Sequence, residues 1–540
     1  MSKVRYFTTP LYYVNAAPHI GHSYTTIAAD CVARYHRLSG ERVFLLTGTD
    51  EHGQKIEQAA AAAGQTPQAF ADQVVTRFTD LWNTLQISHD DFIRTTQPRH
   101  TRAVQAILTR LHDAKQIVRA EYRGWYCTPD ETFWTDAELA QPREMAASPL
   151  SRGPRSQVPT CPACQRPLEP VTEDGWHLPL RAAQPWLQQF VKDHPEFIKP
   201  ASRYNELTNL LEQPLPESLC ITRPKTRVGW GIPVPFSSDH VTYVWFDALL
   251  NYITVPGYVE DPARFRDLWP ADIHFIGKDI LRHHALYWPI ILHAMGFGDE
   301  EMPRTIVAHG WWKIGEQKMS KSLGNIVDPF VVIREVLKHQ PHAADCYRYF
   351  LLREIPFGQD GSFSEEALTV RLNADLANDL GNLVNRTLSM IERYGQGKIP
   401  AAAPIGCAVE DEPLRQAAIG LGAQVDAALS RVEFSTALEA IMRVVTQANQ
   451  YIEVAAPWKL AKQSDHAPRL QMVLSVLAEI IRILSITLEP FMPSVAEAMW
   501  RQLGCGTTPR RFADASRWPG LAAGQPIGPH PVLFPRGEGA

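Results

Sequence analysis

The sequence lacks three features, each of which would indicate a particular class of protein. Only eight of its 540 residues are cysteine, too few for a disulfide-stabilised scaffold in a chain of this length. No run approaches the ~18 continuous apolar residues of a spanning helix, and residues 1–7 hold no apolar signal block, so we expect a cytoplasmic protein without a membrane partner. Neither sign of charge dominates, because 53 Lys and Arg stand against 58 Asp and Glu. A nucleic-acid partner would therefore have to bind to a local patch.

The first hundred residues alternate between strand-like and helix-like runs. Apolar runs at 4–9 and 43–47 predict strands, and the helical spacing between them ends at Gly40, as at a helix C-cap. This alternation is typical of an α/β domain with a mostly parallel sheet. The polar run 48–53 follows the second strand directly, at the edge where open α/β sheets bind ligands.

The α/β pattern is interrupted and then resumes. Residues 121–226 consist of short aromatic and proline-rich pieces, which indicates an inserted module that splits the sheet. Further strands are predicted at 241–246, 273–277 and 305–308. Beyond about Ser364, amphipathic runs joined by polar loops predict a helix bundle. The clearest of these runs cover 368–387, 434–452 and 470–488.

Two short motifs contain side chains suited to binding a nucleotide. His19-Ile20-Gly21-His22 stands between a strand and a helix, where a glycine admits a base or phosphate and imidazoles donate to phosphate oxygens. Lys318-Met319-Ser320-Lys321-Ser322 supplies two mobile point charges suited to a polyphosphate. Alone, the first is more often a capped turn and the second a pair of solvated lysines. Together on one α/β domain, about 300 residues apart, they are much more specific.

These motifs resemble the two signatures of class I aminoacyl-tRNA synthetases, and the closer resemblance is to the methionyl-tRNA synthetase family. The resemblance extends over nearly the whole chain to about residue 500. The other segments that carry it are 11–15, 48–53, 223–224, 230–235, 243–248, 274–279 and 380–383.

The resemblance implies an α/β fold. A Rossmann-like, parallel-sheet catalytic domain is split by an inserted connective module like a zinc knuckle, and an all-α helix bundle that binds the anticodon follows it. The implied boundaries are 1–116 and 229–315 for the two catalytic halves, 117–228 for the inserted module, 316–365 for the lysine loop and stem-contact segment, 366–519 for the anticodon-binding domain and 520–540 for a Gly/Pro-rich tail.

The implied activity is that of a methionine–tRNA ligase. ATP, accompanied by Mg²⁺, activates L-methionine to methionyl-adenylate and pyrophosphate, and methionine then passes to the 3′ end of tRNA(Met), both initiator and elongator. Positioning and charge stabilisation supply most of the catalysis, since the methionine carboxylate is already a nucleophile. The implied catalytic residues are His19, His22, Lys318 and Lys321, and the implied ATP-binding residues are these four with Gly21, Gly277 and Asp279.

The methionine side chain requires a pocket for an unbranched thioether, and aromatic contacts with sulfur are worth ~0.3–1.5 kcal/mol each. By spacing alone, core packing is the more common role of such aromatic residues. The resemblance assigns the methionine site to Leu11, Tyr13, Asp50, Trp245, Ala248, Tyr252, His284 and Trp288. Asp50 would pair with the ammonium group. Homocysteine lacks only the terminal methyl group of methionine, so we expect its adenylate to be edited in the same site. His283 stands where the family commonly carries an aromatic residue such as Phe.

The inserted module contains an altered metal motif. The family often has two Cys-x-x-Cys pairs that hold zinc, and here the pairs read Cys127-x-x-Asp130 and Cys161-x-x-Cys164. Aspartate is a less common ligand than thiolate in structural zinc sites. Two interpretations stay open, a structural Zn²⁺ held by these four residues or a module held by aromatic packing alone.

Three residues of the helical region are candidates for binding tRNA. Asn382 and Arg386 lie four residues apart, hence on one helix face, and Trp458 begins another amphipathic run. An amide, a guanidinium and an indole suit hydrogen bonding and stacking on unstacked bases. Without the resemblance a plain bundle surface is the more common interpretation, and with it the three residues are expected to read the CAU anticodon.

Three other classes of protein share parts of this pattern. A class I synthetase for Ile, Leu or Val would need a longer chain for editing, and one for Cys is a further possibility. A nucleotidyltransferase without tRNA does not explain the helical third of the chain, and a non-catalytic paralogue does not explain the intact motifs. We expect a monomer, because the chain lacks room for the C-terminal tRNA-binding domain of dimeric family members, and we expect residues 531–536 of the tail to dock on the body.

Overall fold

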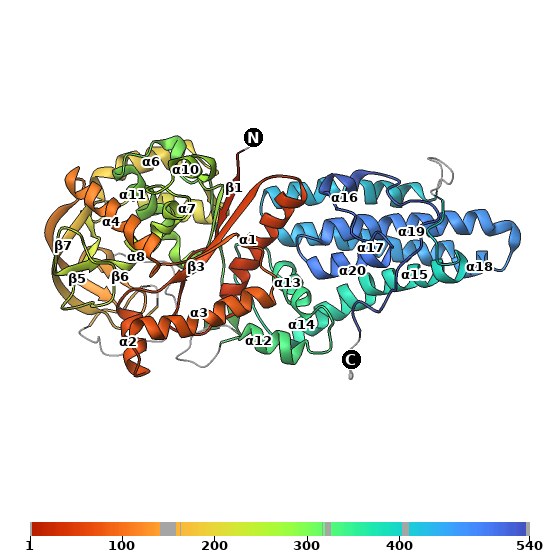
Figure 1. Ribbon diagram of the computed structural model, residues 1–540, viewed down its shortest axis with the longest axis horizontal. Helices are drawn as coiled ribbons and strands as arrows, with labels where there is room; N and C mark the ends of the chain where they lie inside the picture. Colours follow the sequence, from red (N-terminus) through yellow and green to blue (C-terminus); the bar gives the residue numbers. More distant parts are fainter. Residues whose placement is uncertain are drawn as a thin grey trace.

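A computed structural model describes residues 3–140, 158–162, 164–315, 317–318, 326–401 and 410–535. The molecule is elongated, with an α/β lobe formed by the first half of the chain and a helical lobe formed by the second (Figure 1). Helix α1 (Ile20–Leu38) lies where the two lobes meet (Figure 1).

The α/β lobe is built on a seven-stranded sheet. Six strands follow in the order β2-β3-β1-β12-β13-β8, and β4 also pairs with β3. All their pairings are parallel, as predicted. The strands are β1 (Arg5–Thr8), β2 (Tyr12–Tyr13), β3 (Val43–Asp50), β4 (Asp91–Arg94), β8 (Ile198–Lys199), β12 (Ile273–Gly277) and β13 (Ile306–His309). The strands predicted at 4–9, 43–47, 273–277 and 305–308 are confirmed, and β3 continues three residues further.

The prediction of a strand at 241–246 is wrong for residues 244–246. The strand β11 (His240–Thr242) is short and pairs antiparallel with β10 (Thr222–Pro224) outside the main sheet. The chain then turns into helix α8 (Val244–Leu249), whose residues are all buried. A short apolar run that is buried on every side has no periodicity that separates a strand from a helix.

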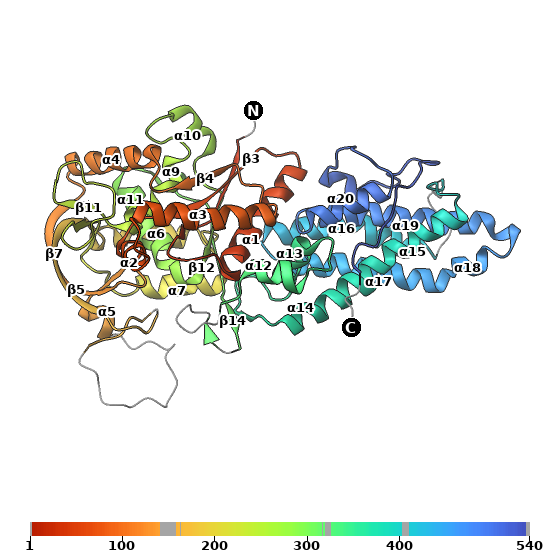
Figure 2. The same ribbon diagram turned by 60° about the horizontal axis from the view of Figure 1, so that its bottom comes forward.

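Helices cover both faces of the main sheet (Figures 1 and 2). Besides α1 and α8 they are α2 (Gln54–Ala62), α3 (Pro67–Thr84), α4 (Pro98–Asp113), α6 (Gln184–Asp193), α7 (Ala201–Leu211), α9 (Asn251–Thr254), α10 (Pro262–Leu268) and α11 (Trp288–Ala294). A π-helical turn, His283–Tyr287, leads directly into α11.

A second, antiparallel sheet lies at the end of the α/β lobe that is far from the helical lobe (Figure 2). Its order is β6-β5-β7-β9, from β5 (Val118–Cys127), β6 (Thr132–Trp134), β7 (Glu169–Pro179) and β9 (Ser218–Cys220). The short α5 (Asp136–Ala140) follows β6. This sheet falls within the range expected for the inserted module, although β8 from the same range joins the main sheet beside β13.

A small three-stranded sheet and a helix bundle complete the chain. The small sheet contains β14 (Trp312–Ile314), β15 (Gln317–Lys318) and β16 (Gly361–Ser362). The predicted bundle is confirmed, and the helical run expected at 368–387 passes through a π-helical segment, Leu372–Gly381. The helices of this part of the chain, from residue 329 onward, are α12 (Pro329–Val331), α13 (Ala343–Arg353), α14 (Glu365–Arg371), α15 (Asn382–Tyr394), α16 (Glu412–Ser430), α17 (Phe434–Ala455), α18 (Pro457–Leu460), α19 (Ala467–Leu488) and α20 (Pro493–Gln502).

Helix α19 is the core helix of this bundle. The segment Ser464–Leu488 has the length and apolar composition of a membrane-spanning helix, but 89% of its most apolar window is buried in the protein. It also contains the buried ion pair of Arg482 with Glu479, at 2.6 Å. Packing against α15, α16, α17 and α20 accounts for its apolar character.

The C-terminal tail docks on the body, as the sequence predicted. Leu533 and Phe534 are buried, and the Gln340 side-chain amide donates to the Pro535 carbonyl oxygen over 2.8 Å. The Gln502 amide donates in the same way to Pro531, at 2.9 Å.

Candidate active site

The two motif histidines cap the start of α1. His19 is the N-cap, and its Nδ1 accepts the Gly21 N–H at 3.1 Å. The Nδ1 of His22 accepts the His19 N–H at 3.0 Å, and the ring centroids lie 3.9 Å apart. Since Nδ1 is the acceptor in both rings, a neutral ring carries its hydrogen on Nε2 and donates there. The capped turn expected from the sequence is therefore present, and it orients both rings as donors at a helix N-terminus.

The segment that follows the lysine motif contacts this helix start. Lys318 belongs to β15, whose backbone pairs with β14 so that Lys318 is opposite Lys313. Lys321 and the rest of the motif lie outside the described residues. The chain is described again from residue 326, and the Val327 carbonyl accepts the Ile20 N–H at 3.2 Å. This backbone contact brings the segment after the lysine motif to the first residue of α1.

Gly277 and Asp279 lie at the carboxyl end of β12. The Asp279 carboxylate accepts the Trp311 indole N–H at 3.2 Å. A Cβ on Gly277 would come within 2.6 Å of that carboxylate, so only glycine leaves it in this place. The ligand-binding edge of a parallel sheet is thus formed here by the ends of β3 and β12 together with the start of α1.

Two lysines and one aspartate form a cluster next to this edge, which the sequence did not predict. Asp360 accepts Lys278 Nζ at 2.7 Å, Lys313 Nζ at 2.8 Å and the Trp311 backbone N–H at 2.9 Å. Burial alone would raise the pKa of this carboxyl, but the two lysines and the N–H hold the pKa well below its ordinary value. The cluster fastens β14, and with it the strand that carries Lys318, to the end of β12.

Asp50 is a buried carboxylate at the end of β3. Burial first, and then Asp247 and Glu131, raise the pKa of Asp50 well above its ordinary value. Its Oδ1 has no hydrogen-bond partner among the described residues. The register of β2 on β3 places Tyr13 beside it. A carboxylate buried in this way is costly unless a cation pairs with it, so the position suits the ammonium group of a ligand.

Aromatic residues continue from Tyr13 into one contiguous cluster. Tyr13 meets Trp245 edge to face, with centroids 6.1 Å apart, and Trp245 lies 6.4 Å from His284. Tyr252 packs on Trp288 at 5.8 Å. Leu11 packs against the same cluster, and Ala248 is buried one turn from Trp245 on α8. All eight residues predicted for the methionine site therefore lie around one region of the α/β lobe.

His284 has a defined protonation state in this cluster. Its Nδ1–H donates to the Ile280 carbonyl at 3.0 Å, so Nε2 accepts the Tyr252 hydroxyl at 2.8 Å. Burial lowers the pKa of His284 to about 4. The ring is neutral at physiological pH and fixes the Tyr252 side chain.

His283 lies in the wall of the cluster. It stacks on Trp245 at a centroid distance of 3.7 Å and an interplanar angle of 19°. Burial lowers its pKa well below the ordinary value, and neither ring nitrogen has a partner among the described residues. A neutral, stacked imidazole occupies this place as a flat ring.

The four predicted metal ligands come together in space. The candidate ligand atoms of Cys127, Asp130, Cys161 and Cys164 all lie within 4.8 Å of one another. Cys127 Sγ is 3.4 Å from Cys164 Sγ, and Cys161 Sγ is 3.2 Å from Asp130 Oδ2. Three sulfurs and one carboxylate oxygen at this spacing match the donor set and the coordination number of a tetrahedral zinc site.

The three predicted anticodon residues lie on the helical lobe. The Arg386 guanidinium is 5.8 Å from the Trp458 ring centroid and forms an ion pair with Glu453 at 2.7 Å, which the sequence did not reveal. Asn382 is exposed one turn before Arg386 on α15. It borders a groove of about 490 Å³ that the C-terminal tail closes on one side. Helix α18, which carries Trp458, is at the tip farthest from the α/β lobe (Figures 1 and 2).

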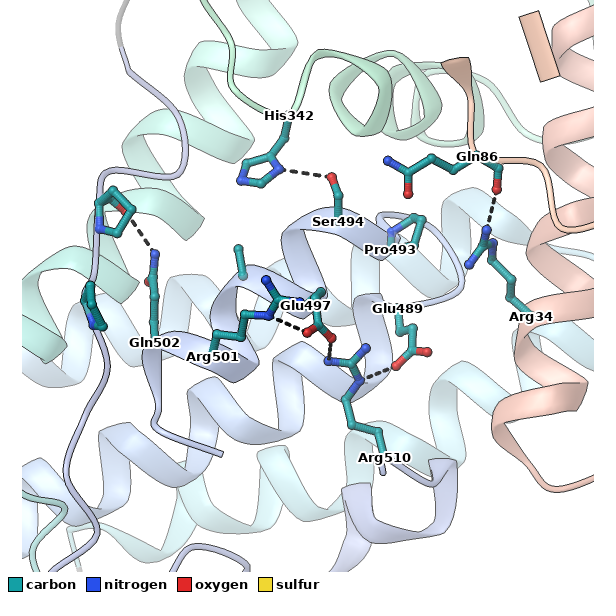
Figure 3. Close-up of a pocket in the computed structure, with 13 residues that line it drawn as sticks. Arg34, Gln86, His342, Glu489, Pro493, Ser494, Glu497, Arg501, Gln502 and Arg510 are labelled. Atoms are coloured by element: carbon teal, nitrogen blue, oxygen red, sulfur yellow. Dashed lines mark hydrogen bonds and ion pairs between the residues drawn. The ribbon is translucent and has the colours of Figure 1, made fainter. Parts of the chain in front are cut away.

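A cavity of about 580 Å³ lies elsewhere, where α1, α20 and the tail meet (Figure 3). None of the predicted site residues lines it. Its arginines are engaged in ion pairs, Arg510 with Glu497 at 3.0 Å and Arg501 with Glu497 at 2.6 Å. The cavity belongs to the contact between the two lobes rather than to the sheet edge described above.

Comparison with known proteins agrees with this fold. Residues 5–388 match the family model described as tRNA synthetases class I (M), and residues 419–523 match the anticodon-binding domain of tRNA ligase. The fold and the site thus define a class I aminoacyl-tRNA synthetase with a helical anticodon-binding domain.

Individual relatives indicate the amino acid on which the synthetase acts. A methionine–tRNA ligase of Caldanaerobacter subterraneus is 44% identical over 99% of this chain and 79% of its own length, and that of Bacillus subtilis is 40% identical over 99% and 78%. A structure of Mycobacterium tuberculosis methionyl-tRNA synthetase in complex with methionyl-adenylate has a TM-score of 0.90 and 40% identity, and covers 99% of this chain and 100% of that one. The chain belongs to the methionyl-tRNA synthetase family. It is a ligase that joins methionine to tRNA.

Proposed function

We propose that both steps of the ligase reaction take place at the sheet edge between Asp50 and the start of α1. The observation that carries this proposal is the buried Asp50 carboxylate, whose Oδ1 has no partner among the described residues, beside Tyr13 and the aromatic cluster. Asp50 pairs with the methionine ammonium, and the aromatic rings surround the thioether. The methionine carboxylate then faces the triphosphate and attacks the α-phosphorus of ATP, which releases pyrophosphate.

The nucleotide is held by the motif residues. The Nε2–H groups of His19 and His22 donate to phosphate oxygens at a helix N-terminus that already favours anions. Gly277 and Asp279 lie at the ribose side. Lys318 and Lys321 stabilise charge on the departing pyrophosphate, with Mg²⁺ entering as part of the ATP complex. The 3′-terminal adenosine of tRNA(Met) accepts methionine in the second step.

Amino-acid-dependent exchange of pyrophosphate into ATP tests this proposal. Methionine should stimulate exchange more than any other amino acid in a panel. Homocysteine should also stimulate it and should consume ATP without charging tRNA, because we propose that its adenylate is edited in the same site. Exchange stimulated by another amino acid but not by methionine would contradict the proposal.

We further propose that Asn382, Arg386 and Trp458 bind the anticodon. Trp458→Ala should raise the KM for tRNA(Met) in aminoacylation roughly 10- to 100-fold, because stacking on one base is worth ~1–3 kcal/mol. Pyrophosphate exchange should remain unchanged, since α18 is far from the α/β lobe. The matched control is Val370→Ala, an exposed position on α14 that should leave both activities intact. Loss of exchange in the Trp458 variant would assign this residue a structural role instead.

We propose that Cys127, Asp130, Cys161 and Cys164 hold one structural Zn²⁺. Elemental analysis of the purified protein should give about one zinc per chain, as a four-ligand structural site requires. Cys161→Ala should abolish it and lower the melting temperature, because metal binding contributes directly to folding. Cys505→Ala, which removes a thiol outside the cluster, should change neither. A full zinc content in the Cys161 variant would refute the ligand assignment.

We also propose that the enzyme charges both initiator and elongator tRNA, acts as a monomer and works in the cytoplasm. The solution mass from light scattering checks the oligomeric state.

A further inference from the structure

A buried network of two histidines and one aspartate lies behind the Asp50 carboxylate. The Nδ1 of His52 is 2.6 Å from one carboxylate oxygen of Asp247, and the Nε2 of His100 is 2.7 Å from the other. All three side chains are nearly inaccessible to solvent, at 7%, 0% and 0% exposure. His52 follows β3 two residues after Asp50, whereas His100 comes from α4 and Asp247 from α8.

The hydrogen-bond partners fix the direction of each bond. A carboxylate only accepts, so His100 donates its Nε2–H to Asp247, and its Nδ1 lies 2.9 Å from the Thr254 hydroxyl. His52 donates Nδ1–H to the second oxygen. Burial alone would raise the pKa of Asp247, but the two histidines outweigh it and the pKa lies below its ordinary value. Asp247 is therefore an ionised acceptor with one donor on each oxygen.

His52 contacts the ammonium site with its backbone and the pocket helix with its ring. Its backbone N–H interacts with the Asp50 carboxylate and partly offsets the effects that raise the pKa of this group. Its ring binds Asp247, which lies on α8 between Trp245 and Ala248. One residue thus links the carboxylate assigned to the ammonium with the helix assigned to the thioether.

We propose that His52 is a positioning residue that sets the spacing between the ammonium subsite and the side-chain subsite of the methionine site. This inference rests on the proposed role of Asp50. Methionine occupies both subsites at once, so its binding depends on a fixed distance between the end of β3 and α8. The triphosphate contacts of α1 lie outside the network and do not depend on it.

Two substitutions of nearly equal size separate positioning from packing. His52→Leu fills the space but removes the donor, whereas His52→Asn places an amide N–H close to the position of the imidazole Nδ1. In pyrophosphate exchange, His52→Leu should raise the KM for methionine about tenfold, the usual cost of losing a hydrogen bond to a buried charge. The KM for ATP should stay within about twofold, and His52→Asn should restore most of the methionine affinity.

The outcomes distinguish this inference from the function on which it rests. Equal impairment of the Leu and Asn variants, or a parallel rise in the KM for ATP, would overturn the positioning role. A normal KM for methionine in His52→Leu would also overturn it, provided that Asp50→Asn is impaired. A normal KM in Asp50→Asn would instead refute the proposed ammonium site. If His52→Leu does not fold, as judged by thermal unfolding, His52→Gln serves in its place, because it keeps a polar side chain but moves the donor one methylene further out.

Discussion

Asp50→Asn is expected to reduce kcat/KM for methionine in pyrophosphate exchange by roughly 100- to 1000-fold, because leaving one partner of a buried charge pair unpaired costs about 2–5 kcal/mol. The asparagine keeps the shape of the side chain and its contact with the His52 N–H but removes the charge. The KM for ATP should change little, since the histidine motif at the start of α1 is separate from the end of β3.

A methionine analogue without the amino group provides the control. The wild-type enzyme should bind the analogue far more weakly than methionine, and Asp50→Asn should bind the two with similar affinity. Because the variant and the analogue each remove one side of the same pair, their effects should not add. Additive losses would show that Asp50 acts through the fold of the pocket rather than through the ammonium.

Local sequence patterns predicted the framework of this enzyme well. The strands β1, β3, β12 and β13 are apolar runs bounded by turn residues, and the histidine motif marks the start of α1. The helices of the second lobe follow from a sustained 3.6-residue period. The exception, residues 244–246, is a run buried on every side, where tertiary packing rather than periodicity decides between strand and helix.

Residue spacing could not predict the contacts between distant segments. Asp360 joins Lys278 across 82 residues, and Asp247 joins His52 across 195. Such pairs form only when the register of the sheet and the packing of its helices bring separate elements together. The metal cluster was predicted from the family's pair of short motifs rather than from residue spacing, since 37 residues separate Cys127 from Cys164.

The predicted site residues were found through their resemblance to a family, and the structure adds physical reasons for some of them. The register of β2 on β3 explains why Tyr13 accompanies Asp50. The hydrogen bond from His284 Nδ1 to Ile280 explains why His284 acts as an acceptor for Tyr252. The stacking of His283 on Trp245 shows how an imidazole packs as a flat ring in the wall of the cluster.

Lys321→Ala is expected to lower kcat for pyrophosphate exchange roughly 100- to 1000-fold, the usual effect of removing one group that stabilises transition-state charge. Negative charge moves onto pyrophosphate as the bond to the α-phosphorus breaks, so an ammonium at the leaving group acts in the transition state more than in the ground state. Lys321 itself lies outside the described residues, and the carbonyl of Val327, which follows it in the chain, accepts the N–H of Ile20 in the histidine motif. The KM for methionine should therefore stay within about threefold.

Two further variants test this role. Lys398→Ala removes an exposed lysine of the helical lobe and should leave kcat unchanged. Lys321→Arg should recover only part of the rate, because a planar guanidinium on a different stem does not reproduce a compact point charge. If Lys321→Ala raised the KM for methionine as much as it lowered kcat, the lysine would act in substrate binding. The stabilisation of departing pyrophosphate would then have to come from Lys318 and the two histidines at the start of α1.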